Sequence, residues 1–167
     1  MEVPFVTKPS PTEHAWERFT GALAECLTDL VEDEFLVISN KTINYYIQFA
    51  GQGRFGMRTE ASCNQYIEPP EAWLDQDDYR AMASLGWHRA TSPRHEKTQG
   101  KPDPDGSPNF FMDVDYPVNS GKVAQLTVQT FRTVFRIGHP GNLQYKAFSR
   151  SGDKIRFPCL HIKREGT

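Results

Sequence analysis

The sequence predicts an α+β fold in which helices pack on one face of an antiparallel sheet. Two observations support this. Residues 43–61 alternate apolar and polar side chains with a period of two, which is the pattern of strands buried on one face. Two longer segments carry apolar residues at steps of three and four, which is the pattern of amphipathic helices. The predicted order is α-βββ-α-ββ-α plus C-terminal strands.

Composition excludes several classes of protein. A chain of 167 residues suits one domain, expected at residues 10–167 after a flexible arm at 1–9. The net charge of −2 gives no reason to expect nucleic acid, and no apolar run is long enough for membrane insertion. The N-terminal residues have no features of a secretory signal. Three widely separated cysteines indicate reduced thiols in a cytoplasmic protein: Cys26, Cys63 and Cys159.

The first helix has a clear predicted start. Ser10 is placed as N-cap, Pro11 at the first helical position, and Glu13 as the partner that completes a capping box. One apolar stripe follows: Trp16, Phe19, Leu23, Cys26, Leu27, Leu30 and Val31. Acidic residues 32–34 then turn the chain into a central strand at 35–38, which is apolar on both faces.

A hairpin follows, and its register is predicted from the alternation. The short connection Gly51-Gln52-Gly53 suits a tight turn that places Ala50 opposite Arg54. The apolar residues then face one another: Phe49 with Phe55, Ile47 with Met57 and Tyr45 with Thr59. On the polar face the same register sets Tyr46 beside Arg58 and Asn44 beside Glu60.

The rest of the chain is predicted from caps and breakers. Asp75 caps a short helix through Leu85, and Gly86 ends it. A brief strand is expected at 87–90, an exposed loop at 91–108 and a strand at 109–116. Asn119 or Ser120 caps a second long helix that runs to about residue 137. Strands at 143–148 and 155–162 complete the sheet, and Pro158 places the last strand at an edge.

One combination of residues resembles a known family. The run YYIQFA…FGMRTEASCNQYIEPP…YRAMASLGW resembles the actinobacterial TY-Chap family. That family is grouped by fold with type III secretion chaperones and YbjN-like proteins. The specific signals are the strand at 46–49, the Glu60-Ala61-x-x-Asn64 exit, the prolines that follow, and Leu85-Gly86-Trp87. The resemblance covers about residues 12–137, so residues of about 140–163 form an extension outside it.

The resemblance implies a non-enzymatic module that binds a peptide or protein client, in a form compatible with a homodimer and without a cofactor. Two surfaces are candidates: an exposed edge strand, which accepts a partner strand, and the polar sheet face, where aromatic and guanidinium side chains offer contact area. The candidate residues on that face are Tyr46, Gln48, Arg58 and Glu60, and Asn64 and Tyr66 are added at the sheet exit.

Other readings stay open. Tyr46 and Arg58 are also explained as an ordinary cation–π pair, and Asn64 as a residue that bonds nearby backbone. A structural or regulatory assembly protein without client binding is the alternative function. Enzymes come third: Cys63 with His88 or His139 has no supporting motif. The candidate metal ligands are equally incomplete, so no metal is expected: residues 103–106, or His88, His95, Asp113 and Asp115.

Overall fold

The computed structural model describes residues 8–91 and 106–166. Most of the predicted arm at 1–9 and of the predicted loop at 91–108 therefore lies outside the described residues. The elements are α1 (Pro11–Asp29), β1 (Glu34–Asn40), β2 (Tyr46–Gly51), β3 (Met57–Ala61), α2 (Gln76–Leu85), β4 (Phe110–Val114), α3 (Ser120–Thr133), β5 (Leu143–Ser149) and β6 (Lys163–Arg164).

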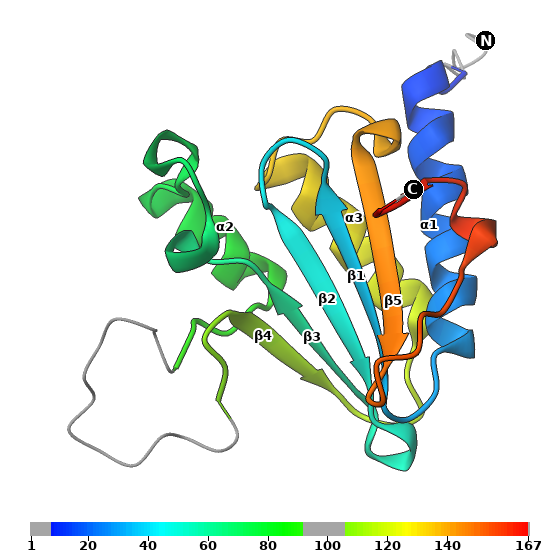
Figure 1. Cartoon of the computed structure of the whole chain (residues 1–167). Helices are drawn as coiled ribbons and strands as arrows, with labels where there is room; N and C mark the ends of the chain where they lie inside the picture. Colours follow the sequence, from blue (N-terminus) through cyan, green and yellow to red (C-terminus); the bar gives the residue numbers. More distant parts are fainter. Residues whose placement is uncertain (1–7, 92–105, 167) are drawn as a thin grey trace, which may run out of the picture.

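In the described part of the chain, one mixed sheet of six strands organises the fold, in the order β4-β3-β2-β1-β5-β6. Every neighbouring pair is antiparallel except β5 and β6, which are parallel. Helices α1 and α3 pack against each other and lie on the same side of the sheet (Figure 1). The predicted α+β class, with helices on one sheet face, is confirmed. No helix in the described ranges is long and apolar enough to cross a membrane.

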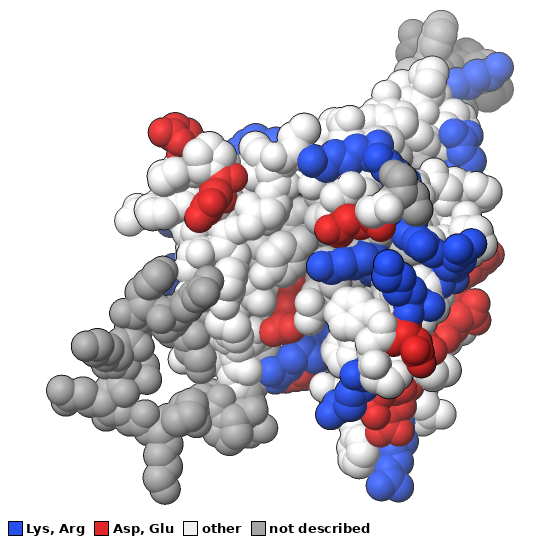
Figure 2. Space-filling model, in the orientation of Figure 1, with Lys and Arg blue, Asp and Glu red and all other residues white. Residues whose placement is uncertain are grey.

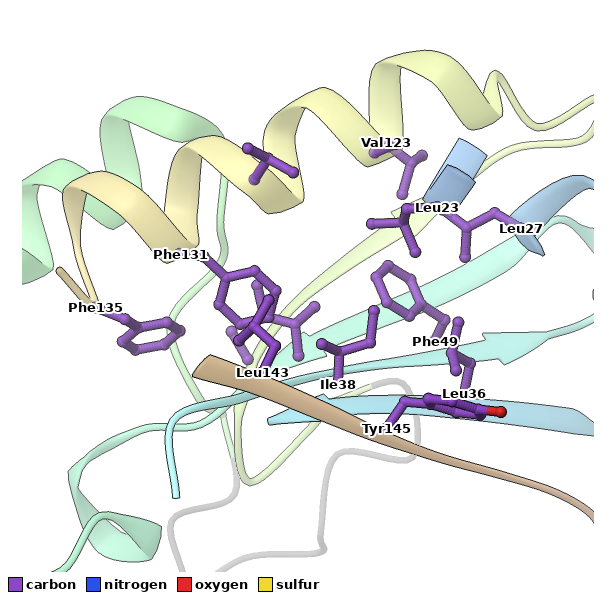
Figure 3. Close-up of a cluster of buried hydrophobic side chains, with 14 of the residues drawn as sticks. Leu23, Leu27, Leu36, Ile38, Phe49, Val123, Phe131, Phe135, Leu143 and Tyr145 are labelled. Carbon is purple, nitrogen blue, oxygen red and sulfur yellow. The ribbon is translucent and has the colours of Figure 1, made fainter. Parts of the chain in front are cut away.

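The hydrophobic core fills the space between the two helices and the sheet. In Figure 3, side chains from α1 and α3 point toward side chains from the three central strands. The labelled residues are Leu23 and Leu27 from α1, Val123 and Phe131 from α3, Phe135 just after α3, and Leu36, Ile38, Phe49, Leu143 and Tyr145 from the strands. Burial of these large apolar side chains supplies most of the driving force for folding.

The helix starts follow from local sequence. Ser10 accepts a hydrogen bond from the Glu13 amide at 3.2 Å, but the Glu13 carboxylate pairs with Arg132 of α3 instead of completing a capping box. Asp75 caps α2 and forms a reciprocal capping box with Asp78. Asn119, one of the two predicted residues, caps α3.

The predicted hairpin register is wrong by four residues. Gly51 pairs with Met57 and Ala50 with Arg58, so residues 52–56 form a longer connection that contains a 3₁₀ turn. Gly53 and Gly56 both have positive φ, which suits this turn. Phe55, predicted to face Phe49, is 66% exposed in the turn. Because the shift is an even number of residues, the side chains of β2 and β3 keep their predicted faces, and only those of the connection change.

Two predicted strands are also corrected. Among the described residues between α2 and α3 (86–91 and 106–119) there is one strand, β4, because residues 87–90 make only a single bridge, from His88 to Phe111. Residues 155–162 are not a strand. They contain a 3₁₀ turn at Pro158–Leu160, which packs on α1. The edge position predicted for the last strand is taken by β6 at residues 163–164.

Candidate functional site: the open sheet face

The face of the sheet that points away from α1 and α3 is the candidate site, and we call it the open face. Strand pairing aligns its side chains in rows across β5, β1, β2, β3 and β4. One row is Lys146, Val37, Gln48, Glu60 and Phe111; the next is Phe148, Phe35, Ala50, Arg58 and Asp113. Figure 2 views this face: lysine and arginine side chains, with acidic side chains among them, gather over β5 and the C-terminal segment (residues 150–166), while the area over β1 and β2 is largely uncharged.

Arg58 is the most heavily bonded side chain on the open face. Its Nε and one terminal nitrogen donate to the two carboxylate oxygens of Asp113 at 2.7 and 2.8 Å, which is a bidentate pair. Its other terminal nitrogen donates to the carbonyl of Gly106 at 2.8 Å, and the guanidinium lies 4.9 Å from the ring centre of Phe111. The hydrogen bonds from Arg58 hold the pKa of Asp113 below its usual value.

Tyr46, Gln48 and Glu60 also have partners on this face. The Tyr46 hydroxyl donates to Asn109 at 2.9 Å, and burial raises the pKa of Tyr46. The Gln48 amide donates to Glu60 at 3.2 Å, and the Ser107 hydroxyl donates to the other Glu60 oxygen. The predicted pairing of Tyr46 with Arg58 is therefore wrong, since the corrected register sets Arg58 opposite Ala50.

These contacts have a common partner, the 106–109 segment that leads into β4. Arg58 binds the Gly106 carbonyl, Glu60 accepts from Ser107, and Tyr46 donates to Asn109. Just beyond β3, the Cys63 thiol donates to the carbonyl of Pro108 at 3.2 Å. The polar groups of β2 and β3 therefore already bind main-chain and small polar groups of a chain segment.

Asn64 and Tyr66 lie apart from these four residues, in a 3₁₀ turn after β3. The Asn64 amide group donates to the carbonyl of Leu74 at 3.0 Å and accepts from its N–H at 2.8 Å. Both ends of the side chain therefore fasten the chain that leads into α2. Tyr66 is partly buried against the core, and its carbonyl accepts a hydrogen bond from Asn44. The structure brings together four of the six candidate residues.

Comparison with known proteins identifies a family for the chain. The family model described as TY-Chap3, T3SS (YopN, CesT) and YbjN peptide-binding chaperone 3, matches residues 9–149. The chain belongs to the TY-Chap3 family. The match runs from α1 through β5, so it includes all five strands that form the open face and extends beyond the resemblance at 12–137. No curated protein and no solved structure matches the chain.

Sequence reasoning missed half of the open face of this TY-Chap3 chain. Phe35 and Phe148 stack with ring centres 5.3 Å apart, beside Val37, which is only 7% exposed. Lys146 borders them and lines a groove of about 320 Å³ between β5 and the C-terminal segment, together with Phe148, Lys154 and Arg164. The signal was the continuous apolar run at 35–38, which the prediction assigned to burial on both faces.

The residues considered as a catalytic nucleophile, base or metal ligand in this TY-Chap3 chain make structural contacts instead. Cys63 donates to a carbonyl, the His88 ring lies 5.3 Å from that of Phe111, and His139 accepts from the Gly141 amide. Residues 103–105 and His95 lie outside the described residues. Within the described ranges, no group of three or more His, Cys, Asp or Glu side chains is arranged to hold a metal ion.

Proposed function

We propose that this TY-Chap3 chain binds a peptide segment of a client protein on the open face, through contacts alone and without a chemical step. The observation that carries the proposal is the 106–109 segment, whose main-chain and polar groups are bound by Tyr46, Arg58 and Glu60. Through these contacts the open face binds a segment of its own chain, and a client segment would lie beside residues 106–109, over β1 and β5, with these hydrogen bonds kept in place. Membership of a peptide-binding chaperone family supports the same function.

The client contacts are proposed to extend over β1 and β5. The half-buried Phe35 and Phe148 rings offer flat apolar area, and Val37 forms the floor between the strands. Lys146 is exposed beside them, and Lys154 borders the same groove. Apolar area next to lysines favours a client segment in which apolar residues alternate with acidic ones.

The alternative is that the open face serves subunit assembly and binds no client. Apolar side chains at the centre of a face, surrounded by charged ones, also suit a contact between two copies of the chain. The two functions predict different states of the free protein. If the open face binds clients, it is exposed in the free protein and can bind a short peptide; if it serves assembly, it is buried between two copies of the chain.

A peptide selection distinguishes these functions. Peptides selected from a displayed random library against the whole protein are tested for affinity to the wild type, to Lys146→Glu and to Lys122→Glu. Both variants change the charge equally, but Lys146 lies on the open face and Lys122 on the exposed first turn of α3. We expect at least about tenfold weaker binding for Lys146→Glu, which corresponds to about 1.4 kcal/mol, and little change for Lys122→Glu.

Two further measurements locate the site. Backbone NMR shifts caused by a selected peptide are expected in β1, β2 and β5, and sedimentation shows whether the free protein is a monomer. Equal affinities for the two variants, with shifts confined to the helices, would overturn the proposed site. A stable dimer that Lys146→Glu dissociates, with no peptide selected, would favour assembly.

A further inference from the structure

Helix α1 and the C-terminal segment (residues 150–166) bring two of the three thiols into contact. The Sγ atoms of Cys26 and Cys159 are 2.9 Å apart, although the residues are 133 positions apart in the chain. We propose that Cys26 and Cys159 are a redox-active dithiol, which closes to an intramolecular disulfide and fastens the C-terminal segment to α1. This inference does not depend on the proposed client binding.

The contact is set by the folding of both elements. Cys26 is fully buried on the inner side of α1, next to Leu27. Cys159 lies in a 3₁₀ turn between Phe157 and Leu160, whose side chains are both buried in the core. Because core packing holds both cysteines, their sulfur atoms stay adjacent whether or not they are bonded. Closing the bond requires the sulfur atoms to approach by about 0.9 Å, to the normal length of about 2.05 Å.

The environments of the two thiols suggest the order of reaction. Cys159 is partly exposed, so a soluble oxidant can reach it, whereas Cys26 cannot be reached from solvent. Burial, above all, and then the neighbouring Cys159 raise the pKa of Cys26; the carboxylates of Asp29 and Glu25 add to this. We therefore assign Cys159 as the thiol that reacts with the oxidant first. Cys26 then attacks the mixed disulfide at Cys159 and closes the intramolecular bond.

With glutathione disulfide as oxidant the reaction balances. Cys159 loses its proton to solvent and its thiolate attacks one sulfur of glutathione disulfide; the S–S bond breaks, and one glutathione thiolate leaves and takes up a proton. Cys26 then loses its proton to solvent and attacks Sγ of Cys159, which displaces the second glutathione as its thiolate. Two electrons pass from the protein thiols to the oxidant, and two reduced glutathione molecules are released.

The disulfide would fix a segment that covers a sheet edge. Main-chain hydrogen bonds join the C-terminal segment to the outer side of β5, from the Ile155 amide to Ala147 at 2.9 Å and from the Glu165 amide to Tyr145 at 2.7 Å. In the reduced protein, only noncovalent contacts hold this segment in place, among them the ion pair of Arg150 with Asp33. In the oxidised protein, the Cys26–Cys159 disulfide holds the segment to α1. The β5 edge then opens only if this disulfide is reduced or if residues on either side of Cys159 move away from β5.

The test uses the whole protein in glutathione buffers of graded redox ratio. After acid quenching and alkylation of free thiols, intact mass and peptide mapping identify the bonded residues. We expect a product lighter by two hydrogen atoms, with Cys26 joined to Cys159 and Cys63 alkylated. Cys63→Ser is the matched control and should still form the bond, since the Cys63 thiol lies against Pro108 instead. Cys159→Ser should not form it.

Two comparisons make the outcome decisive. In urea, where the pair is no longer held together, we expect at least tenfold more glutathione disulfide to be needed for the same oxidised fraction. Hydrogen exchange at residues 154–165 should be slower in the oxidised protein than in the reduced one. A mixed disulfide that stops at Cys159, a bond to Cys63, or equal oxidation with and without urea would overturn the proposal.

Discussion

Arg58 uses its guanidinium group on three sides, against Asp113, Gly106 and the ring of Phe111. Residue type and strand alternation predicted that Arg58 would lie on the polar face, and it does. Its partners were not predictable, because Asp113 and Gly106 follow it by 55 and 48 positions and reach it only through β4. Asn64 is a similar case, since its partner Leu74 is fixed by a turn that alternation does not reveal.

The Arg58–Asp113 pair predicts how stability depends on pH. The pKa of Asp113 is lowered from 3.8 in the folded protein, so the pair stabilises fully above pH 3.8, and its contribution is lost as the pH falls through the lower folded value. Because Asp113 is 54% exposed, we expect Asp113→Asn to lower the free energy of unfolding at pH 7 by only about 1 kcal/mol. The difference from wild type should shrink only below pH 3.8.

Urea unfolding between pH 7 and pH 3 measures this difference. Asp77→Asn is the control, because the Asp77–Arg80 pair is far more exposed and should contribute within about 0.5 kcal/mol at any pH. A loss in Asp113→Asn that is the same at pH 3 and pH 7 would show that packing, and not charge, explains the effect.

At the scale of elements, the connection between β2 and β3 shows what alternation cannot decide. The apolar–polar pattern continues through Phe55, although the chain turns there. The reason lies in a third strand: a Cβ atom on Gly56 would lie 1.9 Å from the carbonyl oxygen of Val114, so the turn must present a glycine where β4 passes. A contact with an element more than 50 residues later cannot be inferred from the hairpin alone.

Two glycine substitutions test this explanation. Gly56→Ala combines that clash with a φ of +97°, so we expect the free energy of unfolding to fall by at least about 2 kcal/mol. Gly21→Ala, in α1, has nothing within 4 Å of the added atom and should raise stability by about 1 kcal/mol through helix propensity. Chemical denaturation of both variants measures the changes. Similar stabilities would mean that the turn adapts and that Gly56 is not required.

At the scale of the whole molecule, features fixed by neighbouring residues were predictable from the sequence, whereas features fixed by contacts between distant residues were not. Caps at Ser10, Asp75 and Asn119 predicted the helix starts, because a cap acts within one turn. The sheet order was not predictable, since β1 pairs with β5 more than 100 residues later and β6 adds in parallel. For the same reason, the apolar half of the open face on β1 and β5 became visible only once these strands were paired.

The C-terminal segment lies outside the family match at 9–149 but contributes to the core. Phe157 and Leu160 are buried, and each side chain of this size stabilises by roughly 2 kcal/mol. We therefore expect a chain ending at Ser149 to lose on the order of 4 kcal/mol in a reducing buffer and to self-associate through the uncovered edge of β5.

Thermal or urea unfolding, together with light scattering, measures both effects. The full-length double variant Phe157→Ala/Leu160→Ala is the control: it should reproduce most of the lost stability while retaining the residues that cover the edge. If the shortened chain were as stable as the full one and monomeric, the segment would be dispensable for the fold.

The 106–109 segment also bears on how the chain can change during evolution or in engineering. Because Tyr46, Arg58 and Glu60 hold it immediately before β4, the register of β4 is set by these contacts and not by the length of chain that precedes them. Insertions or deletions among residues 92–105 should therefore leave the β3–β4 pairing unchanged. This stretch is the natural place to splice an epitope, a fluorophore or a second domain into the protein.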